Sequence, residues 1–294
     1  ISYFNGVNFF IKNNPLPIEF ILLRYSPKPF SPIDAFAFSG YMGYSFATSV
    51  TKDILFSTLL EKLPATLFHD LEKRAKQNTI NFKVLSTISP LTDFDGSNAW
   101  VLSGKRTKSG KPILASDPHI SFSLPGIWYE AHIKTPTHEI YGHYLPLIPF
   151  PALGHNKYIG WGLTMSKVDD MDFYAETFSK DKKKVLYKNS WVKIKSYKEI
   201  INIKGEKPIE IEIKLTPHGP IMDYVFDKKN ISMKWSYYEP DNLALDTLYL
   251  AERAKTWEEF KHAFSFGAAP GLHIAYADSS GNIGSLVYGK IPNR

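Results

Sequence analysis

The sequence predicts an α+β fold in which a helix-rich part is followed by a sheet-rich part. Apolar stretches with helical spacing, one of them led by a serine and a proline, occupy much of the first 76 residues. From residue 97 onward, short apolar runs alternate with glycine, proline, asparagine and aspartate, which is typical of strands and turns. Helices and strands are therefore expected to segregate along the chain.

The first elements are expected to be a strand-and-turn segment and two helices. Residues 9–24 contain two prolines and the apolar run EFILL, which favours strand and turn. Ser31 can cap a long helix with Pro32 in its first turn, and apolar residues then continue to residue 60 past two glycines that loosen or kink it. A second, amphipathic helix is expected over residues 64–76.

The sheet-rich part follows a stretch with weak periodicity, residues 77–96, which is interpreted as a spacer. The expected strands cover residues 100–102, 112–115, 127–133, 158–163, 173–178 and 209–215.

Two further helices and a hairpin complete the expected elements. One helix is expected over residues 241–254, and Thr256 caps the next, with Glu259 placed for a capping box. Residues 274–277 and 283–288 then form a hairpin.

Composition excludes several classes of protein. With 44% hydrophobic and 15% aromatic residues in 294, the chain can bury a core. It has no cysteine, which excludes disulfides, thiol nucleophiles and cysteine metal sites. The net charge of +6 is largely due to lysine, and the densest run, KDKKK at residues 180–184, has no interleaved aromatics. A solvated loop is expected there rather than a nucleic-acid site, and no apolar run is long enough to predict a membrane span.

The block of sequence with the clearest chemistry is DGSNAWVLSGKRTKSGKPILASDPH, residues 95–119. A nucleophilic serine needs a base and an oxyanion site, and Ser97 stands after Gly96 at the start of a predicted strand. It does not match the GxSxG elbow of α/β-hydrolases. A Gly-Ser pair alone is more often simply a loop that enters a sheet.

The block as a whole resembles the start of the catalytic chain in the penicillin acylase family of N-terminal nucleophile hydrolases. Upstream, GVNFFI, LPIEF and the helix around Met42 and Phe46 resemble the end of the family's small chain. Order and spacing agree over nearly the whole length. The matching motifs are SNAW, SGKPILASDPH, GHN, GWGLT, DDMDFYAE, HGP, YADSSGNIG and GKIP.

This resemblance implies an architecture and a division of the chain. The expected fold is a four-layer αββα sandwich with antiparallel sheets, incomplete at both ends. Residues 1–76 match the C-terminal part of the small-chain region, residues 77–96 the spacer, and residues 97–294 the N-terminal part of the catalytic chain. The small and large chains are expected to stay associated after cleavage, and the family's location implies a periplasmic or secreted protein.

The resemblance also implies a mechanism. Cleavage between Gly96 and Ser97 exposes Ser97 as an N-terminal nucleophile whose own α-amino group acts as the base. The backbone N–H of Met165 falls at the position of an oxyanion donor. His119 falls where the family places a residue whose main chain contacts the amine of the serine; a purely conformational role for His119 is the alternative.

A second oxyanion donor, an asparagine in a later motif, is expected beyond Arg294. The loss of such a donor typically lowers turnover by about a hundred- to a thousandfold. The chain alone is therefore expected to be inactive or weakly active, either as a piece of a larger enzyme or as a degenerate family member.

A structural calcium site is implied at Asp169, Met171 and Asp172, through two carboxylates and one main-chain carbonyl. By the same resemblance, the glutamate that completes the site in relatives falls on Lys52, with Asp53 adjacent. The alternative is a polar strand edge without a metal, where Asp170 is solvated.

The acyl group is expected in an apolar pocket between the long helix and the sheet, lined by Met42 and Phe46. Other aromatics are interpreted as core or surface residues: Tyr41, Tyr44, Phe122 and Trp128.

The function implied is hydrolysis of a small-molecule N-acyl amide, such as an acylated β-lactam, with no cofactor beyond structural calcium and no nucleic-acid or membrane partner. Two alternatives remain open. The first is an acyl-homoserine-lactone acylase, which would quench quorum signals. The second is an inactive homologue that binds a ligand or partner through the same cleft.

Overall fold

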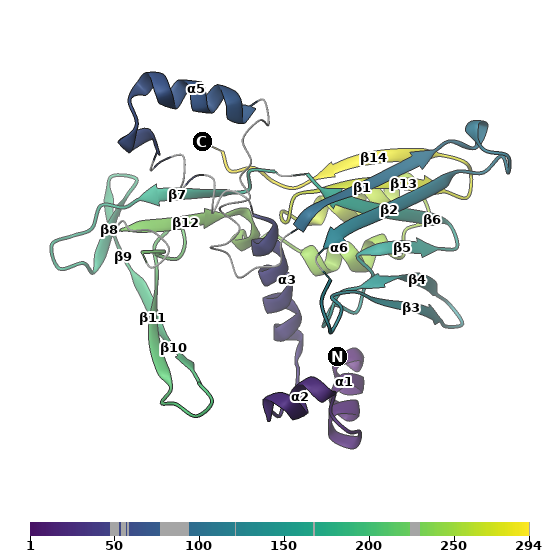
Figure 1. The fold of residues 1–294 in the computed structure, drawn as a ribbon, viewed down its shortest axis with the longest axis horizontal. Coiled ribbons are helices and arrows are strands. Elements are labelled where there is room, and N and C mark those ends of the chain that lie inside the picture. The colour runs from purple at the N-terminus through teal and green to yellow at the C-terminus, as the bar shows by residue number, and fades with distance from the viewer. Residues whose placement is uncertain are drawn as a thin grey trace.

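The computed structural model describes residues 1–47, 53, 57, 59–76, 94–120, 122–166, 168–223 and 230–293 (Figure 1). Within these ranges, helices and antiparallel strands are largely segregated along the chain, which confirms the α+β prediction. Most of the predicted spacer, residues 77–93, lies outside the described residues, as does Lys52.

The strand-and-turn prediction for residues 9–24 was wrong, because this segment lies in two helices. They are α1 (Ser2–Asn13) and α2 (Ile18–Leu23). Phe4 of α1 is buried in a small core with Ala35 and Ile148, so a helical face is what this segment contributes to the core. The predicted proline breaks are present, since Pro17 is the N-cap of α2.

Helix α3 (Pro32–Phe46) begins where the sequence predicts. The Asp34 carboxylate accepts hydrogen bonds from the backbone N–H of Ser31 at 2.6 Å and from its hydroxyl at 2.8 Å. The predicted extension to residue 60 is interrupted, because α3 ends at Phe46 and Ala47 has extended backbone. Helix α5 (Ala65–Lys76) confirms the second predicted helix.

A six-stranded antiparallel sheet forms the centre of the structure, in the order β14-β13-β6-β5-β4-β3. The predicted hairpin is confirmed, since its two strands pair from Leu272↔Tyr288 to Ala277↔Ile283. The strands are β3 (Tyr129–Lys134), β4 (Glu139–Tyr144), β5 (Leu153–Asn156), β6 (Ile159–Met165), β13 (Leu272–Asp278) and β14 (Ile283–Tyr288).

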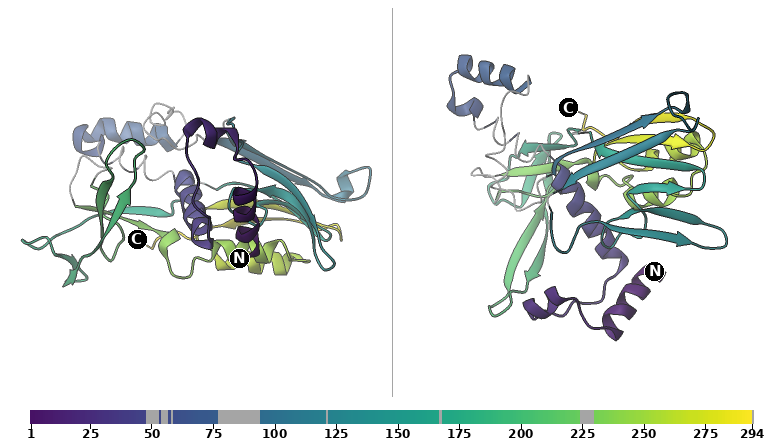
Figure 2. Two further views of the ribbon diagram at one scale, coloured as in Figure 1. Left: turned by 90° about the horizontal axis from the view of Figure 1, so that it is seen from below. Right: turned by 45° about the vertical axis from the view of Figure 1, so that its right-hand side comes forward.

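The two faces of this sheet are covered differently, as Figure 2 shows. A two-stranded ladder of β1 (Phe94–Leu102) and β2 (Ile113–Ile120), joined through η2 (Gly104–Arg106), lies over one face. It approaches closely, because a Cβ built on Gly162 of β6 would lie 2.4 Å from the Cβ of Ser116.

Helices cover the other face and enclose the main core. They are α6 (Ala244–Ala251), α7 (Trp257–Ala263) and η4 (Phe264–Phe266). Phe260 of α7 packs on Trp161 and Tyr276, and all three are almost fully buried. Thr256 caps α7 as predicted, whereas Glu259 accepts from the backbone N–H of Lys255 at 2.8 Å.

Shorter sheets lie on the far side of α3 from the central sheet (Figure 1). β7 (Met171–Ala175) pairs with β12 (Ile231–Trp235), which leads into η3 (Ser236–Tyr238). β8 (Lys184–Tyr187) pairs with β9 (Ser190–Lys193), and β10 (Lys195–Ile201) with β11 (Ile209–Leu215). The lysine run at residues 180–184 forms the exposed turn before β8 and the first residue of that strand, and it is solvated as predicted.

The described layers are therefore helices, the central sheet and the β1–β2 ladder, with α3 beside them. The four-layer αββα arrangement expected from the sequence remains a prediction. None of the helices in the described ranges is long and apolar enough to cross a membrane.

Candidate functional site

Ser97 and Met165 meet where the β1–β2 ladder crosses the end of β6. The backbone N–H of Met165 donates a hydrogen bond to Ser97 Oγ, with 3.4 Å between the two atoms. Met165 is the last residue of β6, and Ser97 lies opposite Pro118 in the ladder. The predicted nucleophile and the predicted oxyanion donor are thus brought together from positions 68 residues apart.

The backbone just before Ser97 has an unusual conformation. Gly96 has φ of +150°, and the register of β1 with β2 is irregular between Phe94 and Gly96. A side chain is disfavoured at such a φ, so this position favours glycine. The predicted cleavage point therefore follows directly after the irregularity, while Gly96 and Ser97 themselves pair with His119 and Pro118.

Ser116 joins the β1–β2 ladder to β6 through hydrogen bonds to the backbone of Leu163. Its hydroxyl accepts a hydrogen bond from the backbone N–H of Leu163 at 3.1 Å and lies 3.3 Å from the carbonyl oxygen of the same residue. Sequence analysis did not single out Ser116. The available signal was a small hydroxyl residue in β2 that could face the glycine of GWG, Gly162.

His119 lies opposite Gly96 in the ladder. Its Nε2 is 2.9 Å from Oδ2 of Asp117 and 3.4 Å from the amide nitrogen of Asn98. The structure thus places His119 next to the predicted cleavage point, through its neighbour Gly96. Asp117 is a second residue of this site that sequence analysis did not identify.

Met42 and Phe46 of α3 line one apolar cavity of about 100 Å³, together with residues of the central sheet and α6. Leu163 and Leu272 belong to its wall, and Leu272 pairs with Met165, so the cavity reaches the end of β6 that meets Ser97. Trp128, interpreted from the sequence as a core or surface residue, also lines this cavity. The remaining lining residues are Ser39, Leu145, Ile148, Ala152, Ala244, Thr247, Leu248, Phe264, Ala269, Pro270 and Tyr288.

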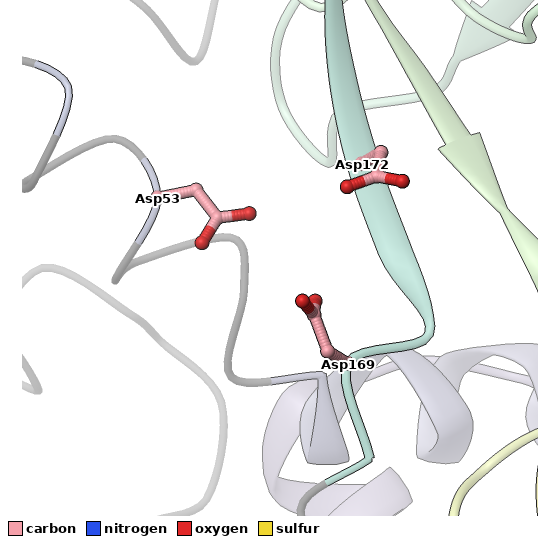
Figure 3. Close-up of side chains that lie close together, drawn as sticks. All are labelled: Asp53, Asp169 and Asp172. Carbon is pink, nitrogen blue, oxygen red and sulfur yellow. The ribbon is translucent and has the colours of Figure 1, made fainter. Parts of the chain in front are cut away.

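Three aspartates converge at a second position, shown in Figure 3. One carboxylate oxygen each from Asp53, Asp169 and Asp172 lies within 4.8 Å of the others. Asp172 is in β7, Asp169 precedes it, and Asp53 comes from the helical segment after α3. Three hard oxygen donors at this spacing suit a cation such as calcium. The sequence placed a lysine, Lys52, where relatives have a glutamate ligand. Asp53, the next residue, provides a carboxylate in its place.

Two neighbours of this cluster point into the protein core instead. Met171 is fully buried in a cluster with Met222, Met233 and Trp235, so only its backbone could serve a cation. Asp170 is 2% exposed, and its Oδ2 accepts a hydrogen bond from Trp235 Nε1 at 3.3 Å. The expectation that Asp170 is solvated was wrong, and burial raises its pKa to about 6.

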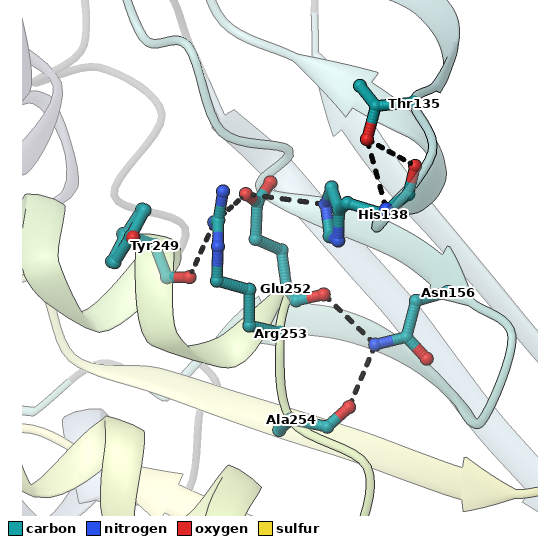
Figure 4. A network of polar contacts seen from close by, with 7 residues as sticks. All are labelled: Thr135, His138, Asn156, Tyr249, Glu252, Arg253 and Ala254. Atoms are coloured by element: carbon teal, nitrogen blue, oxygen red, sulfur yellow. Dashed lines mark hydrogen bonds and ion pairs between the residues drawn. The ribbon is translucent and has the colours of Figure 1, made fainter.

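Asn156, in the GHN motif, has a structural role (Figure 4). Its amide nitrogen donates to the backbone oxygens of Glu252 at 2.9 Å and Ala254 at 2.8 Å. Its oxygen accepts from the backbone N–H groups of Tyr158 at 2.7 Å and Ile159 at 2.9 Å. The side chain therefore joins the β5–β6 turn to the end of α6.

Comparison with known families and proteins places this geometry in context. The family model described as penicillin amidase matches residues 1–294. The chain belongs to the penicillin amidase family. Its similarity therefore extends over α1, α3 and the entire described sheet region.

Curated relatives of this penicillin amidase family member are acylases. An acyl-homoserine lactone acylase, QuiP, of Pseudomonas aeruginosa is 25% identical over 99% of the chain and 39% of its own length. Penicillin acylase 2 proenzyme of Pseudomonas sp. strain SE83 is 25% identical over 100% of the chain and 41% of its own length. The chain thus spans about two fifths of the length of these relatives.

A solved structure is also similar. Thermostable penicillin G acylase from Alcaligenes faecalis superposes with a TM-score of 0.59 at 26% sequence identity. The match covers 65% of this chain and 35% of that structure. The penicillin amidase family member described here thus shares a fold with a penicillin acylase over about two thirds of its length.

Proposed function

We propose that this chain carries the nucleophile of an acyl amide hydrolase, and that the nucleophile is Ser97 after the Gly96–Ser97 bond is cut. The observation that supports this most directly is the contact between Ser97 Oγ and the N–H of Met165 at 3.4 Å. A serine hydroxyl next to a strand-end N–H provides both a nucleophile and an oxyanion donor. The acylases among the curated relatives support the same class of reaction.

The proposed cleavage of the Gly96–Ser97 bond has two steps. Ser97 Oγ adds to the carbonyl carbon of Gly96, the amide nitrogen leaves as an amine, and water then hydrolyses the resulting ester. The irregular register between Phe94 and Gly96 lies just before this peptide link, and the φ of +150° at Gly96 favours glycine on its acyl side. The products are a carboxylate at Gly96 and a free α-amino group on Ser97.

The exposed amine then serves the main reaction. Its pKa in a peptide is about 8, so a useful fraction is neutral near pH 7 and can take the proton of the Ser97 hydroxyl. Ser97 Oγ attacks the carbonyl carbon of an N-acyl amide, and the oxyanion accepts a hydrogen bond from the N–H of Met165. The amine product leaves with a proton, and water hydrolyses the acyl-enzyme.

The acyl group would enter the cavity lined by Met42 and Phe46. Its wall is apolar and includes no charged side chain among the described lining residues, which favours an uncharged acyl chain. The leaving amine would lie outside the cavity. A β-lactam amine and a homoserine lactone are both admissible, and the printed names of the relatives include acylases of each kind.

Calcium would bind at Asp53, Asp169 and Asp172 and have a structural role. When bound, it would offset two of the three carboxylate charges and join Asp53 to β7. The chain segments before and after the cut would stay together, because α3 packs on the rest of the protein. For example, a Cβ on Gly43 would lie 3.2 Å from the Trp235 ring.

Intact mass and N-terminal sequencing of the purified protein test the proposal, with Ser97→Ala as the control. The expected result is a chain that begins SNAW, and its absence from Ser97→Ala. Turnover of phenylacetyl amides and of long-chain acyl homoserine lactones then separates the two substrate classes. An uncut wild-type chain that is not labelled by an acylating probe would reject the proposal and favour an inactive homologue.

Phe46→Ala tests the acyl cavity separately. Because Phe46 lines the cavity and not the contact between Ser97 and Met165, it should change the preference among acyl chains and leave cleavage of Gly96–Ser97 intact. Equal effects on all acyl chains would argue against this cavity as the acyl site.

A further inference from the structure

The two faces of the β1–β2 ladder present different groups to the Gly96–Ser97 bond. Ser97 Oγ lies on the face that meets β6, because it contacts the N–H of Met165. Asn98 and Asp117 are paired across the ladder, and both lie next to the His119 ring, so these side chains share the other face. A nucleophile and an imidazole thus flank one peptide bond.

The contacts of the His119 ring favour one neutral tautomer. Nε2 lies 2.9 Å from the Asp117 carboxylate, a charge-assisted contact that is shorter than the 3.4 Å to the Asn98 amide nitrogen. A carboxylate can only accept, so in the neutral ring Nε2 carries the hydrogen and Nδ1 holds the lone pair. Among the described residues, Nδ1 has no hydrogen-bond partner.

Nδ1 faces Gly96 across a gap. A Cβ built on Gly96 would lie 3.9 Å from Nδ1, and no other described atom outside its chain neighbours lies within 4 Å of that point. Glycine leaves this space open. A water molecule placed there would lie between a basic nitrogen and the residue whose carbonyl carbon must be hydrolysed.

We propose that His119 is the general base for the hydrolytic step of Gly96–Ser97 cleavage, and that Asp117 is the positioning residue that holds its tautomer; this rests on the proposed function. Ser97 Oγ first forms the ester with Gly96 from the β6 face. Water then attacks the ester carbonyl carbon from the other face while His119 Nδ1 takes one of its protons.

The step balances without any further reactant. The new bond joins the water oxygen to the Gly96 carbonyl carbon, and the bond that breaks joins this carbon to Ser97 Oγ. The proton on Nδ1 passes to the departing serine oxygen. The products are the Gly96 acid, which ionises, and the free hydroxyl of Ser97, and His119 returns to its starting form.

The test is a pulse–chase of the full chain made by in-vitro translation, with His119→Ala, Asp117→Asn and the charge-matched control Glu199→Gln on exposed β10. We expect His119→Ala to slow the appearance of the SNAW chain by about 100-fold and Asp117→Asn by about tenfold, with no change in the control. Both slow variants should accumulate the ester. Neutral hydroxylamine should then cut them and leave a hydroxamate at Gly96, and imidazole should accelerate His119→Ala but not Asp117→Asn.

Three outcomes would overturn the assignment. If both variants cleave at the wild-type rate while Ser97→Ala stays uncut, His119 has no part in cleavage and the proposed nucleophile stands. If the variants are slow but hydroxylamine does not cut them, His119 acts before the ester forms or only supports the fold. If the wild-type chain itself stays uncut, the proposed function fails and this inference fails with it.

Discussion

The hydroxyl of Ser116 contacts both backbone polar groups of Leu163, which also pairs with Ile274 of β13: it accepts from the Leu163 N–H at 3.1 Å and lies 3.3 Å from the Leu163 oxygen. Because Leu163 is two residues before Met165, this contact also sets where Ser97 meets Met165. Ser116→Ala should therefore lower the free energy of unfolding by about 1 kcal/mol, the usual contribution of one hydrogen bond. The variant should also slow cleavage of the Gly96–Ser97 bond, because the distance between Ser97 Oγ and the N–H of Met165 is expected to increase.

Urea unfolding and the rate of SNAW formation measure the two effects of Ser116→Ala. Ser190→Ala, at an exposed position of β9, is the matched control and should change neither. A Ser116→Ala protein with normal cleavage would mean that other contacts hold the ladder in place.

Gly162→Ala should separate the ladder from the central sheet. The new Cβ would lie 2.4 Å from the Cβ of Ser116 and 3.4 Å from the Leu114 side chain, so one layer has to move. Overpacking of this kind typically costs about 1–3 kcal/mol. Thermal unfolding should show the loss, whereas Gly6→Ala in α1, where a Cβ meets nothing within 4 Å, should be neutral or slightly stabilising.

Calcium should stabilise the protein through Asp53, Asp169 and Asp172. At a free concentration of about 100 times Kd, binding adds about 2.7 kcal/mol to the free energy of unfolding. The midpoint of thermal unfolding should rise with calcium and fall with a chelator. Asp169→Asn and Asp172→Asn should each weaken this response, and Asp181→Asn, in the exposed turn before β8, should keep it. A wild-type midpoint that is indifferent to calcium would reject the site.

Glu252 should make stability depend on pH. Burial raises the pKa of Glu252 above its ordinary value of 4.5, and Arg253 opposes this only in part. The folded protein therefore binds the proton more tightly than the unfolded chain does. This contribution is complete below about pH 4.5 and is lost as pH rises through the folded-state pKa.

Glu252→Gln removes this titration and should flatten the fall in stability as pH rises above about 4.5. His138 Nε2 lies 3.6 Å from Glu252 Oε1, and both residues are drawn in Figure 4. Burial lowers the pKa of His138, so its contribution to stability rises with pH where that of Glu252 falls. Both proteins retain His138, so the difference between their pH profiles reports Glu252 together with its coupling to His138. Glu258→Gln, at an exposed position of α7, is the control and should leave the pH profile of stability unchanged. Identical profiles for wild type and Glu252→Gln would refute the prediction.

The order and spacing of the sequence motifs were sufficient to predict several residues of the candidate site. Gly96, Ser97 and Met165 lie together as the resemblance implied, and Met42 and Phe46 share a cavity. Local patterns were sufficient for α5, for the start of α3 and for the β13–β14 hairpin. In these segments, caps, turn residues and periodicity all favour the same structure.

Other features depend on tertiary contacts that no local pattern contains. The apolar run of α2 is too short to distinguish strand from helix by period, and α1 is helical where Phe4 meets Ala35 and Ile148. Asp53 lies near Asp169 and Asp172 although more than 100 residues separate them in the sequence. Ser116 and Asp117 read as ordinary strand residues until β2 is placed over β6.

Asn156 has a consequence for the chemical ageing of the protein. Deamidation requires the amide carbon to swing onto the following backbone nitrogen, here that of Lys157, and four backbone hydrogen bonds hold this side chain in place. While the β5–β6 turn stays docked on α6, the reaction is blocked (Figure 4). The rate at which Asn156 converts to aspartate in stored protein would therefore report how often this turn opens.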